Sequence, residues 1–208
     1  MNTNALNNAL NNALNNTLNN ATEQAQDKTY NILFLCTGNS ARSIMAEALV
    51  TTLSHHRFKG FSAGSHPSGA VNPFAIEQIK KTGYPTETLR SKSWDEFAQK
   101  DAPHMDFIIT VCDNAAGETC PLWLGHPVSA HWGFEDPASA QGTDAEKRCV
   151  FETIYVQIMG RINAFLNLPS LAMQPMDKLA IQQGMKSIGE SQLSEIKLSE
   201  IKPSKHVV

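Results

Sequence analysis

Short apolar runs alternate with stretches of helical periodicity between residues 30 and 166, and this alternation limits the possible fold more than any other feature of the chain. The runs at 30–35, 59–63, 106–112 and 128–132 are short and apolar, as buried strands are. Between them, apolar residues recur at three- and four-residue spacing, which indicates helices with one buried face. The order predicts an α/β fold with a four-stranded parallel sheet, doubly wound.

Four helical segments accompany these strands. Apolar residues from Ile44 to Leu53 fall on one helical face, and Pro73 opens a second helix that stops at Gly83. Residues 93–97 form a short helical segment, and residues 144–166 form a long final helix. The first strand therefore leads through a tight loop into the first helix.

The two ends of the chain have a different composition. Residues 1–27 repeat asparagine, alanine and leucine in a low-complexity leader, which we expect to be disordered. Residues 169–208 form a polar C-terminal tail with room for a marginal helix, and we assign it no function. Residues 28–168 are then the folded domain.

Charge and apolar content exclude several classes of protein. The net charge of −3 gives no basic field for neutralising nucleic-acid phosphates, so we expect no nucleic-acid partner. No apolar stretch approaches the roughly 18 residues that a membrane span needs, and the N-terminus has no secretory pattern. Four cysteines are too few for a disulfide-rich secreted protein of this length. We therefore expect a cytoplasmic protein with reduced thiols and no membrane partner.

The loop after the first strand carries the strongest functional signal. Ligands of open α/β sheets bind beyond the carboxyl ends of the strands, and the amides and dipole at a helix N-terminus favour a tetrahedral oxyanion. The same field favours a thiolate, so we expect a lowered pKa and a nucleophilic sulfur at Cys36. The planar fork of Arg42 suits two oxyanion oxygens, and Ser43 can hydrogen-bond the thiolate. The candidate substrate loop is Cys36, Thr37, Gly38, Asn39, Ser40, Ala41, Arg42 and Ser43.

These residues resemble a known family. Cys36, five intervening residues, Arg42 and Ser43, with Asp136-Pro137 about a hundred residues later, resemble the low-molecular-weight protein tyrosine phosphatases and the arsenate reductases built on the same fold. The resemblance covers about residues 29–168. It implies that Cys36 is the nucleophile, that Arg42 grips the oxyanion, and that Asp136 protonates the leaving oxygen.

Cys112 and Cys120 separate the two activities of this family. Cys112 ends the third predicted strand, at the sheet edge of Cys36, and a second thiol there can resolve a thiol–arsenate adduct into a disulfide, a step that a phosphatase does not need. The resemblance assigns Cys112 as the resolving thiol and Cys120 as the last thiol of the relay. The competing interpretation makes Cys112 a core residue and Cys120 incidental. Ala138 and Ser139 stand where tyrosine phosphatases carry aromatic residues, which favours arsenate reductase.

Three functions therefore stay open: arsenate reductase, phosphomonoester-hydrolysing phosphatase, and a non-catalytic anion-binding or redox-sensing module. For the reductase, the substrate is arsenate and the reductant is thioredoxin, or glutaredoxin with glutathione. We predict no cofactor.

We also predict no metal. Some family members bind potassium beside the loop, and Asn39 and Ser62 match two of the ligand positions, but residues 90–95 do not match the others. The spacing of Cys149 beside Phe151 predicts a buried, inert cysteine. We place His55, His56 and His66 at the surface.

Overall fold

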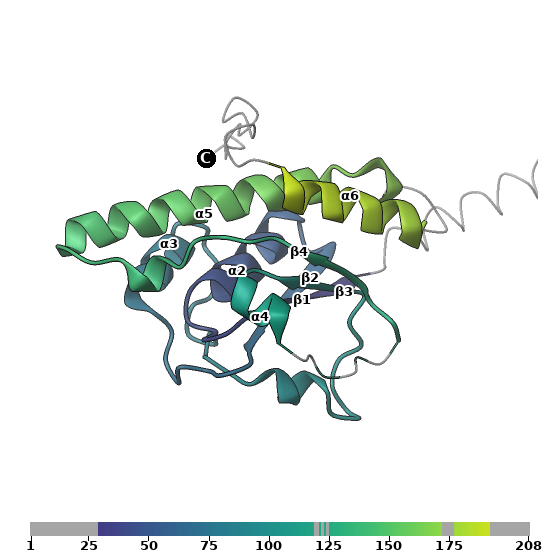
Figure 1. Ribbon diagram of the computed structural model, residues 1–208, viewed down its shortest axis with the longest axis horizontal. Coiled ribbons are helices and arrows are strands. Elements are labelled where there is room, and N and C mark those ends of the chain that lie inside the picture. The colour runs from purple at the N-terminus through teal and green to yellow at the C-terminus, as the bar shows by residue number, and fades with distance from the viewer. Residues whose placement is uncertain (1–28, 119–120, 122, 124, 172–176, 192–208) are drawn as a thin grey trace, which may run out of the picture.

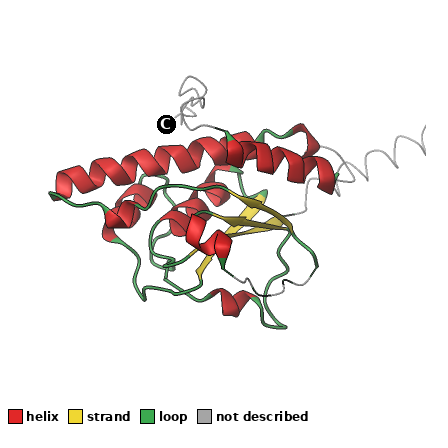
Figure 2. Ribbon diagram, viewed as in Figure 1, coloured by secondary structure: helices red, strands yellow, loops and turns green. Residues whose placement is uncertain are grey.

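The computed structural model describes residues 29–118, 121, 123, 125–171 and 177–191, so the leader and Cys120 lie outside the described residues. Its centre is a four-stranded sheet in which every paired strand is parallel, in the order β2-β1-β3-β4 (Figures 1 and 2). The strands are β1 (Tyr30–Cys36), β2 (Phe58–Gly64), β3 (Phe107–Thr110) and β4 (Val128–His131). The predicted α/β fold with four parallel strands is confirmed.

The described helices are α2 (Arg42–Leu53), α3 (Pro73–Lys80), η1 (Trp94–Phe97), α4 (Asp113–Gly117), η2 (Pro137–Ser139), α5 (Asp144–Leu166), η3 (Pro169–Leu171) and α6 (Lys178–Glu190). Four of these eight described helices agree with the four predicted segments, and α4, η2, η3 and α6 are added to them. The third strand is shorter than predicted, because Cys112 already caps α4: its sulfur accepts a hydrogen bond from the Ala115 N–H. The apolar pattern did not show this one-turn helix.

One face of the sheet is covered by α2, α5 and α6, and the larger part of the core lies there (Figure 1). Aromatic rings of Phe58, Phe107, Trp132 and Phe165 contact one another edge to face or tilted across this layer. Aromatic contacts of this kind stabilise the core beyond what the burial of apolar surface alone contributes. The opposite face has a smaller core, in which Trp94 of η1 packs with buried residues of β1, β2 and β3.

Helix α5 starts on a capping box between Thr143 and Glu146 and extends past the sheet at its beginning. Its first buried residue is Phe151, and the two preceding residues, Cys149 and Val150, are exposed. The prediction of a buried Cys149 is therefore wrong. The apolar spacing there resembled a core face, but in the part of the chain that the structure describes, the side of the helix that bears Cys149 and Val150 is exposed.

The folded core continues beyond residue 168. Leu171 is fully buried, and α6 buries Ile181, Met185 and Ile188 against the rest of the core. Helix α6 also runs beside β4, the edge strand (Figure 1). The sequence allowed for a marginal helix in a polar tail, whereas the structure shows a helix with one buried face, because three apolar residues at helical spacing suffice when an edge strand is there to be covered.

The strand order places a topological switch point between β1 and β3. From β1 the chain proceeds to β2 on one side, and after β2 it crosses to β3 on the other. In open parallel sheets, the crevice outside the carboxyl ends of these two strands is the usual place for a ligand. Cys36 ends β1, and Cys112 follows β3 by two residues. Both thiols are therefore at this crevice.

In the part of the chain that the structure describes, no helix is long and apolar enough to span a bilayer.

Candidate active site

The loop from Cys36 to Ser43 wraps around the Cys36 sulfur. The Cys36 Sγ lies 3.0 Å from the Ser43 Oγ and 3.1 Å from the Asn39 backbone nitrogen, which donates to it. The Asn39 Nδ2 donates to the Ser43 Oγ at 2.9 Å. Since that oxygen already accepts a hydrogen bond from Asn39, its own O–H is free to donate to the sulfur. Two donors thus converge on the position where a thiolate would carry its charge.

Asn39 gives the loop its sharp turn. Its φ is 43°, in the left-handed region that asparagine tolerates better than most residues. The side chain is fully buried, and its Oδ1 accepts a hydrogen bond from the Lys92 N–H at 2.8 Å, which also fixes the orientation of the amide. Gly38, beside it, does not have a positive φ. The turn predicted around Gly38 therefore depends on Asn39.

The loop carbonyls bond outward to the segment that follows β2. The carbonyl oxygens of Thr37, Gly38 and Ser40 accept hydrogen bonds from the backbone of residues 66, 68 and 72. In a trans peptide the N–H points opposite to the C=O, so the next residue's amide points to the loop interior. Gly64 allows this packing, because a Cβ there would lie 2.4 Å from the Thr37 oxygen. Inward amides with a helix start behind them can hold a tetrahedral oxyanion.

Arg42 is the first residue of α2, and it joins the loop to the predicted acid. Its Nη2 lies 3.3 Å from the Asp136 Oδ2, and its Nη1 donates to the Phe134 carbonyl at 3.0 Å. The Asp136 Oδ1 accepts from the Ala138 N–H, so the carboxylate also caps η2. The structure therefore brings Arg42 and Asp136 together from positions 94 residues apart.

Cys112 is buried beside the loop. Its sulfur lies 3.5 Å from the Thr37 Oγ1 and accepts from the Ala115 N–H at 3.5 Å. A negative charge on Cys112 also raises the pKa of Cys36, as expected when two thiolates share one site. Of the predicted relay, Cys36 and Cys112 are thus neighbours, whereas Cys120 lies outside the described residues.

The pKa of the Cys36 thiol is raised from its ordinary value, because burial disfavours the thiolate. The hydrogen bonds from Ser43 and Asn39 act in the opposite direction. The sequence led us to expect a lowered pKa, since it shows the helix start behind the loop but not how deeply the sulfur is buried. The hydrogen bonds from Ser43 and Asn39 therefore favour the thiolate against the cost of burial.

A buried ion pair that the sequence did not reveal lies under the loop. The Lys92 Nζ is 3.6 Å from the Glu47 Oε2, and both side chains are almost buried. The Ser62 hydroxyl donates to the same carboxylate oxygen at 2.5 Å. The Tyr84 hydroxyl also donates to Glu47, and burial together with this carboxylate raises the pKa of Tyr84 to about 12. The Lys92 Nζ donates to the Ser62 hydroxyl at 3.4 Å, so Ser62 is hydrogen-bonded to both members of the ion pair.

Other predicted positions have simpler surroundings. His55, His56 and His66 are exposed, as predicted. Ala138 and Ser139 are in η2, and the nearby rings of Trp132 and Phe134 are buried, with the Arg161 guanidinium 4.6 Å from the centre of the Phe134 ring. Among the described residues, no three His, Cys, Asp or Glu side chains gather as metal ligands would.

Comparison with known proteins places this loop in a family. The model of the low molecular weight phosphotyrosine protein phosphatases matches residues 31–176. The chain belongs to this family. An arsenate reductase of Bacillus subtilis is 38% identical over 134 residues, 64% of this chain and 93% of the relative, and one of Halalkalibacterium halodurans is 39% identical over the same shares. The resemblance seen in the sequence is thus confirmed.

Solved structures agree with this family assignment. A structure described as an arsenate reductase in the phosphate binding state has a TM-score of 0.53 and 28% identity, covering 66% of this chain and 96% of its own. A second, described as an arsenate reductase in oxidized state, has a TM-score of 0.53 and 26% identity, covering 65% of this chain and 95% of its own. In both cases the alignment with this chain includes nearly the whole length of the known structure.

Proposed function

We propose that this protein is an enzyme that reduces arsenate to arsenite, with Cys36 as the nucleophile and Cys112 as the resolving thiol. One observation carries the proposal: a second buried thiol, Cys112, lies against Thr37, the loop residue next to Cys36, and is near enough to act electrostatically on the Cys36 thiol. A phosphatase has no use for a thiol at that position. The curated relatives at 38% and 39% identity bear the name arsenate reductase, which supports this reading.

The first step is the attack of the Cys36 thiolate on the arsenic of a bound arsenate. An S–As bond forms and an As–O bond breaks, while arsenic stays As(V). The departing hydroxyl takes a proton from Asp136 and leaves as water. The inward loop amides and Arg42 hold the remaining oxygens, and charge that develops on them is met by donors already in place. Arg42 and Asp136 are paired at 3.3 Å, so acid and oxyanion clamp lie at one mouth of the loop.

The second step is the attack of the Cys112 thiolate on the Cys36 sulfur. An S–S bond forms, the S–As bond breaks, and its electron pair leaves with arsenic, which becomes As(III) in arsenite. The two cysteines together lose two electrons. Cys120 then attacks Cys112, frees Cys36 and forms a new disulfide, which the reductant reduces. A bridge needs Cα atoms within about 7 Å, so this exchange requires the segment from 112 to 120 to bring the two cysteines that close.

The electron donor is a dithiol protein such as thioredoxin, or glutaredoxin with glutathione. We place the reaction in the cytoplasm, because each cycle has to return the cysteines to the thiol form and the cytoplasm maintains that state.

Hydrolysis of phosphomonoesters is the second candidate, because Cys36, Arg42 and Asp136 are arranged as a phosphatase would need them. The residues that would contact the aryl group of a phosphomonoester suggest that this phosphatase activity is weak. The residues after Asp136-Pro137 are Ala138 and Ser139, which offer an aryl group no ring to stack on. Binding of an oxyanion without turnover would instead indicate the third candidate, a non-catalytic or redox-sensing module.

The decisive experiment is arsenite production by the purified protein in two reducing systems, one with thioredoxin, its reductase and NADPH, the other with glutathione and glutaredoxin. Sustained turnover in either system supports the proposal and identifies the donor. No arsenite in both, with rapid hydrolysis of para-nitrophenyl phosphate, would make the protein a phosphatase.

Two variants test the roles of the thiols. Cys36→Ser should abolish arsenate reduction and phosphate hydrolysis alike, because a serine hydroxyl is almost never ionised at neutral pH. Cys112→Ser should stop arsenate turnover and spare the hydrolysis of para-nitrophenyl phosphate. Normal multiple turnover of arsenate by Cys112→Ser would refute the relay.

A further inference from the structure

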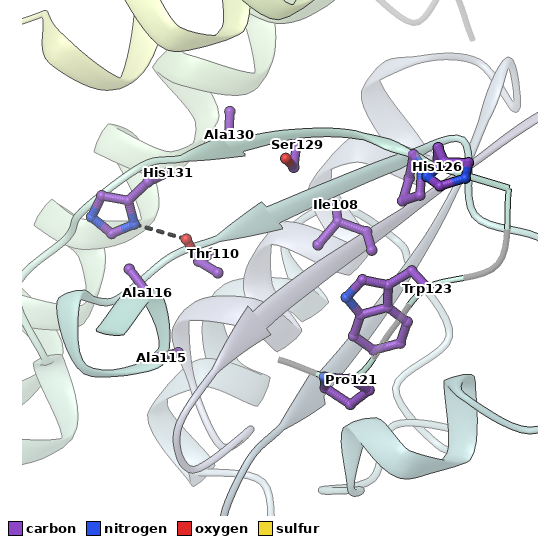
Figure 3. Close-up of a pocket in the computed structure, with 11 residues that line it drawn as sticks. Ile108, Thr110, Ala115, Ala116, Pro121, Trp123, His126, Ser129, Ala130 and His131 are labelled. Carbon is purple, nitrogen blue, oxygen red and sulfur yellow. Dashed lines mark hydrogen bonds between the residues drawn. The ribbon is translucent and has the colours of Figure 1, made fainter. Parts of the chain in front are cut away.

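A histidine bridge holds both sides of Cys112. The His131 Nδ1 lies 2.8 Å from the Thr110 Oγ1, and the His131 Nε2 lies 3.0 Å from the Asp113 Oδ1. Figure 3 shows the first of these bonds, with the His131 ring reaching from β4 across to the end of β3. Thr110 is the last residue of β3, and Asp113 is the first residue of α4. The ring therefore spans the short segment that contains Cys112.

The three groups are complementary as hydrogen-bond partners. The Asp113 carboxylate can only accept, so the Nε2–H donates to it, and the Thr110 hydroxyl can either donate to Nδ1 or accept from it. The carboxylate makes the second bond directional, and solvent screens it, because Asp113 is largely exposed. The bridge thus ties the end of a buried strand to a side chain that is itself 89% exposed.

The orientation of the Cys112 side chain depends on Thr110 and Asp113, the two residues that His131 joins. It lies between them as the N-cap of α4, where its sulfur meets the Ala115 N–H on one side and the Thr37 hydroxyl on the other. A helix of five residues has little stability of its own, because nucleation is costly and each end lacks partners. Its start therefore needs an anchor outside the helix, and His131 supplies one.

The surrounding backbone leaves room for this bridge. A Cβ on Gly133 would lie 2.9 Å from the Asp113 Oδ1 and 3.2 Å from the His131 Nε2. Any side chain at position 133 would therefore displace the carboxylate from the ring. Position 133 itself is fixed, because the Gly133 carbonyl accepts a hydrogen bond from Arg161 at 2.8 Å.

We infer that His131 is a positioning residue for the resolving thiol, holding Cys112 in line with the Cys36 sulfur through its bonds to Thr110 and Asp113. The inference rests on the proposed function, in which Cys112 attacks Cys36. It adds that the efficiency of this attack depends on a bridge that touches neither substrate nor sulfur. Misplacement of a reacting group by about 1 Å can lower a rate about 100-fold. The first step, on Cys36, needs no part of the bridge.

The test separates the two steps. Fully reduced protein without external reductant is mixed with arsenate, and the single-turnover release of arsenite is timed; hydrolysis of para-nitrophenyl phosphate reports the Cys36 step alone. Asp113→Ala and His131→Phe should each slow arsenite release about 10- to 100-fold while changing phosphate hydrolysis less than about twofold. Gly133→Ala should slow it in the same direction, since it displaces the carboxylate.

Two controls keep the result specific. Asp113→Asn retains an accepting oxygen and should recover most of the rate lost in Asp113→Ala. Asn114→Ala alters the neighbouring exposed residue of the same helix and should match the unaltered protein. Arsenite release at the unaltered rate in both Asp113→Ala and His131→Phe would overturn the inference, and so would a parallel loss of phosphate hydrolysis, which would mean general damage to the site.

Failure of the inference and failure of the proposed function give different results. If Cys112→Ser releases arsenite normally, the proposed function fails. If Cys112→Ser is inactive and the bridge variants are fully active, only the positioning role fails.

Discussion

At the scale of single residues, the reactivity of Cys36 depends on two opposing influences. Burial raises the pKa of its thiol, and hydrogen bonds from Ser43 and Asn39 lower it. The Ser43 hydroxyl contributes the larger of these two hydrogen-bond effects. A hydrogen bond to a charged group contributes about 1.5–3 kcal/mol, a factor of ten or more in the thiolate population. Ser43 is therefore a principal control of the nucleophile.

We predict that Ser43→Ala raises the pKa of Cys36 further. A thiol reacts as its thiolate, which prevails only above the pKa, so the rate of alkylation by iodoacetamide should rise at higher pH than in the unaltered protein. At pH 7 the rate should fall about tenfold, since one charged hydrogen bond is lost. The pH profile of alkylation, followed by mass spectrometry of the Cys36 peptide, measures both effects. Ser68→Ala, just outside the loop, should leave the profile in place, and an unshifted profile in Ser43→Ala would contradict the assignment.

The Glu47–Lys92 pair gives a prediction about stability. Lys92→Met leaves the nearly buried Glu47 carboxylate without its cation, and breaking a buried pair from one side costs about 3–5 kcal/mol. We expect a loss near the lower end, because both side chains keep a little exposure. Urea unfolding measures it. The double variant Lys92→Met with Glu47→Gln should recover much of the loss, whereas equal losses in the single and double variants would rule out the charge as the cause.

The sequence was sufficient to predict the loop from Cys36 to Ser43 but not most of the residues that contact it, because those residues are distant along the chain. The loop residues from Cys36 to Ser43 are contiguous, so their pattern could be recognised directly, and Asp136 was found because it precedes a proline. Glu47 and Lys92 are 45 residues apart, and His131 is 18 residues from Asp113. Nothing in their spacing indicates contact. Glu47 and Lys92 meet because α2 packs on β2 and Gly64 of β2 bridges to Ser93, whereas His131 reaches Asp113 because β3 pairs with β4.

At the scale of elements, α6 supports the segment that bears the predicted acid. The Trp132 Nε1–H donates to the Met185 carbonyl at 3.0 Å, and Arg161 of α5 donates to the carbonyls of Gly133 and Gly189. Helix α6 follows the residues 31–176 that match the family model. The strands and long helices were predictable from apolar periodicity, but α6 was not, because its function as a cover for β4 appears only once β4 is known to be an edge.

A matched pair of glycines tests this support. A Cβ on Gly189 would lie 2.1 Å from the His131 carbonyl oxygen, so Gly189→Ala should push α6 off the strand and destabilise the protein by about 1–3 kcal/mol, as overpacking does. Gly184→Ala in the same helix meets only the flexible end of Leu168 and should be neutral or stabilising, since alanine favours helix. Thermal unfolding compares the two. Equal effects would show that the approach of α6 to His131 is unimportant.

At the scale of the whole molecule, the fold determines which thiols can take part in chemistry. Cys36 and Cys112 are buried at the crevice between β1 and β3, whereas Cys149 is exposed on α5. Exposure makes a cysteine available to reagents, but the proposed relay requires a thiol next to the oxyanion loop. The most accessible described cysteine, Cys149, should therefore not be one that the reaction needs.

We predict that N-ethylmaleimide labels Cys149 faster than Cys36 or Cys112 in the reduced protein, as peptide mass spectrometry of a time course would show. Cys149→Ser should remove this fast-reacting thiol, leave arsenite production unchanged, and shift the free energy of unfolding by no more than about 0.5 kcal/mol, as surface substitutions usually do. Loss of arsenite production in Cys149→Ser would mean that a thiol on the outer helix takes part in the electron transfer, and the relay would then have to extend beyond the switch point of the sheet.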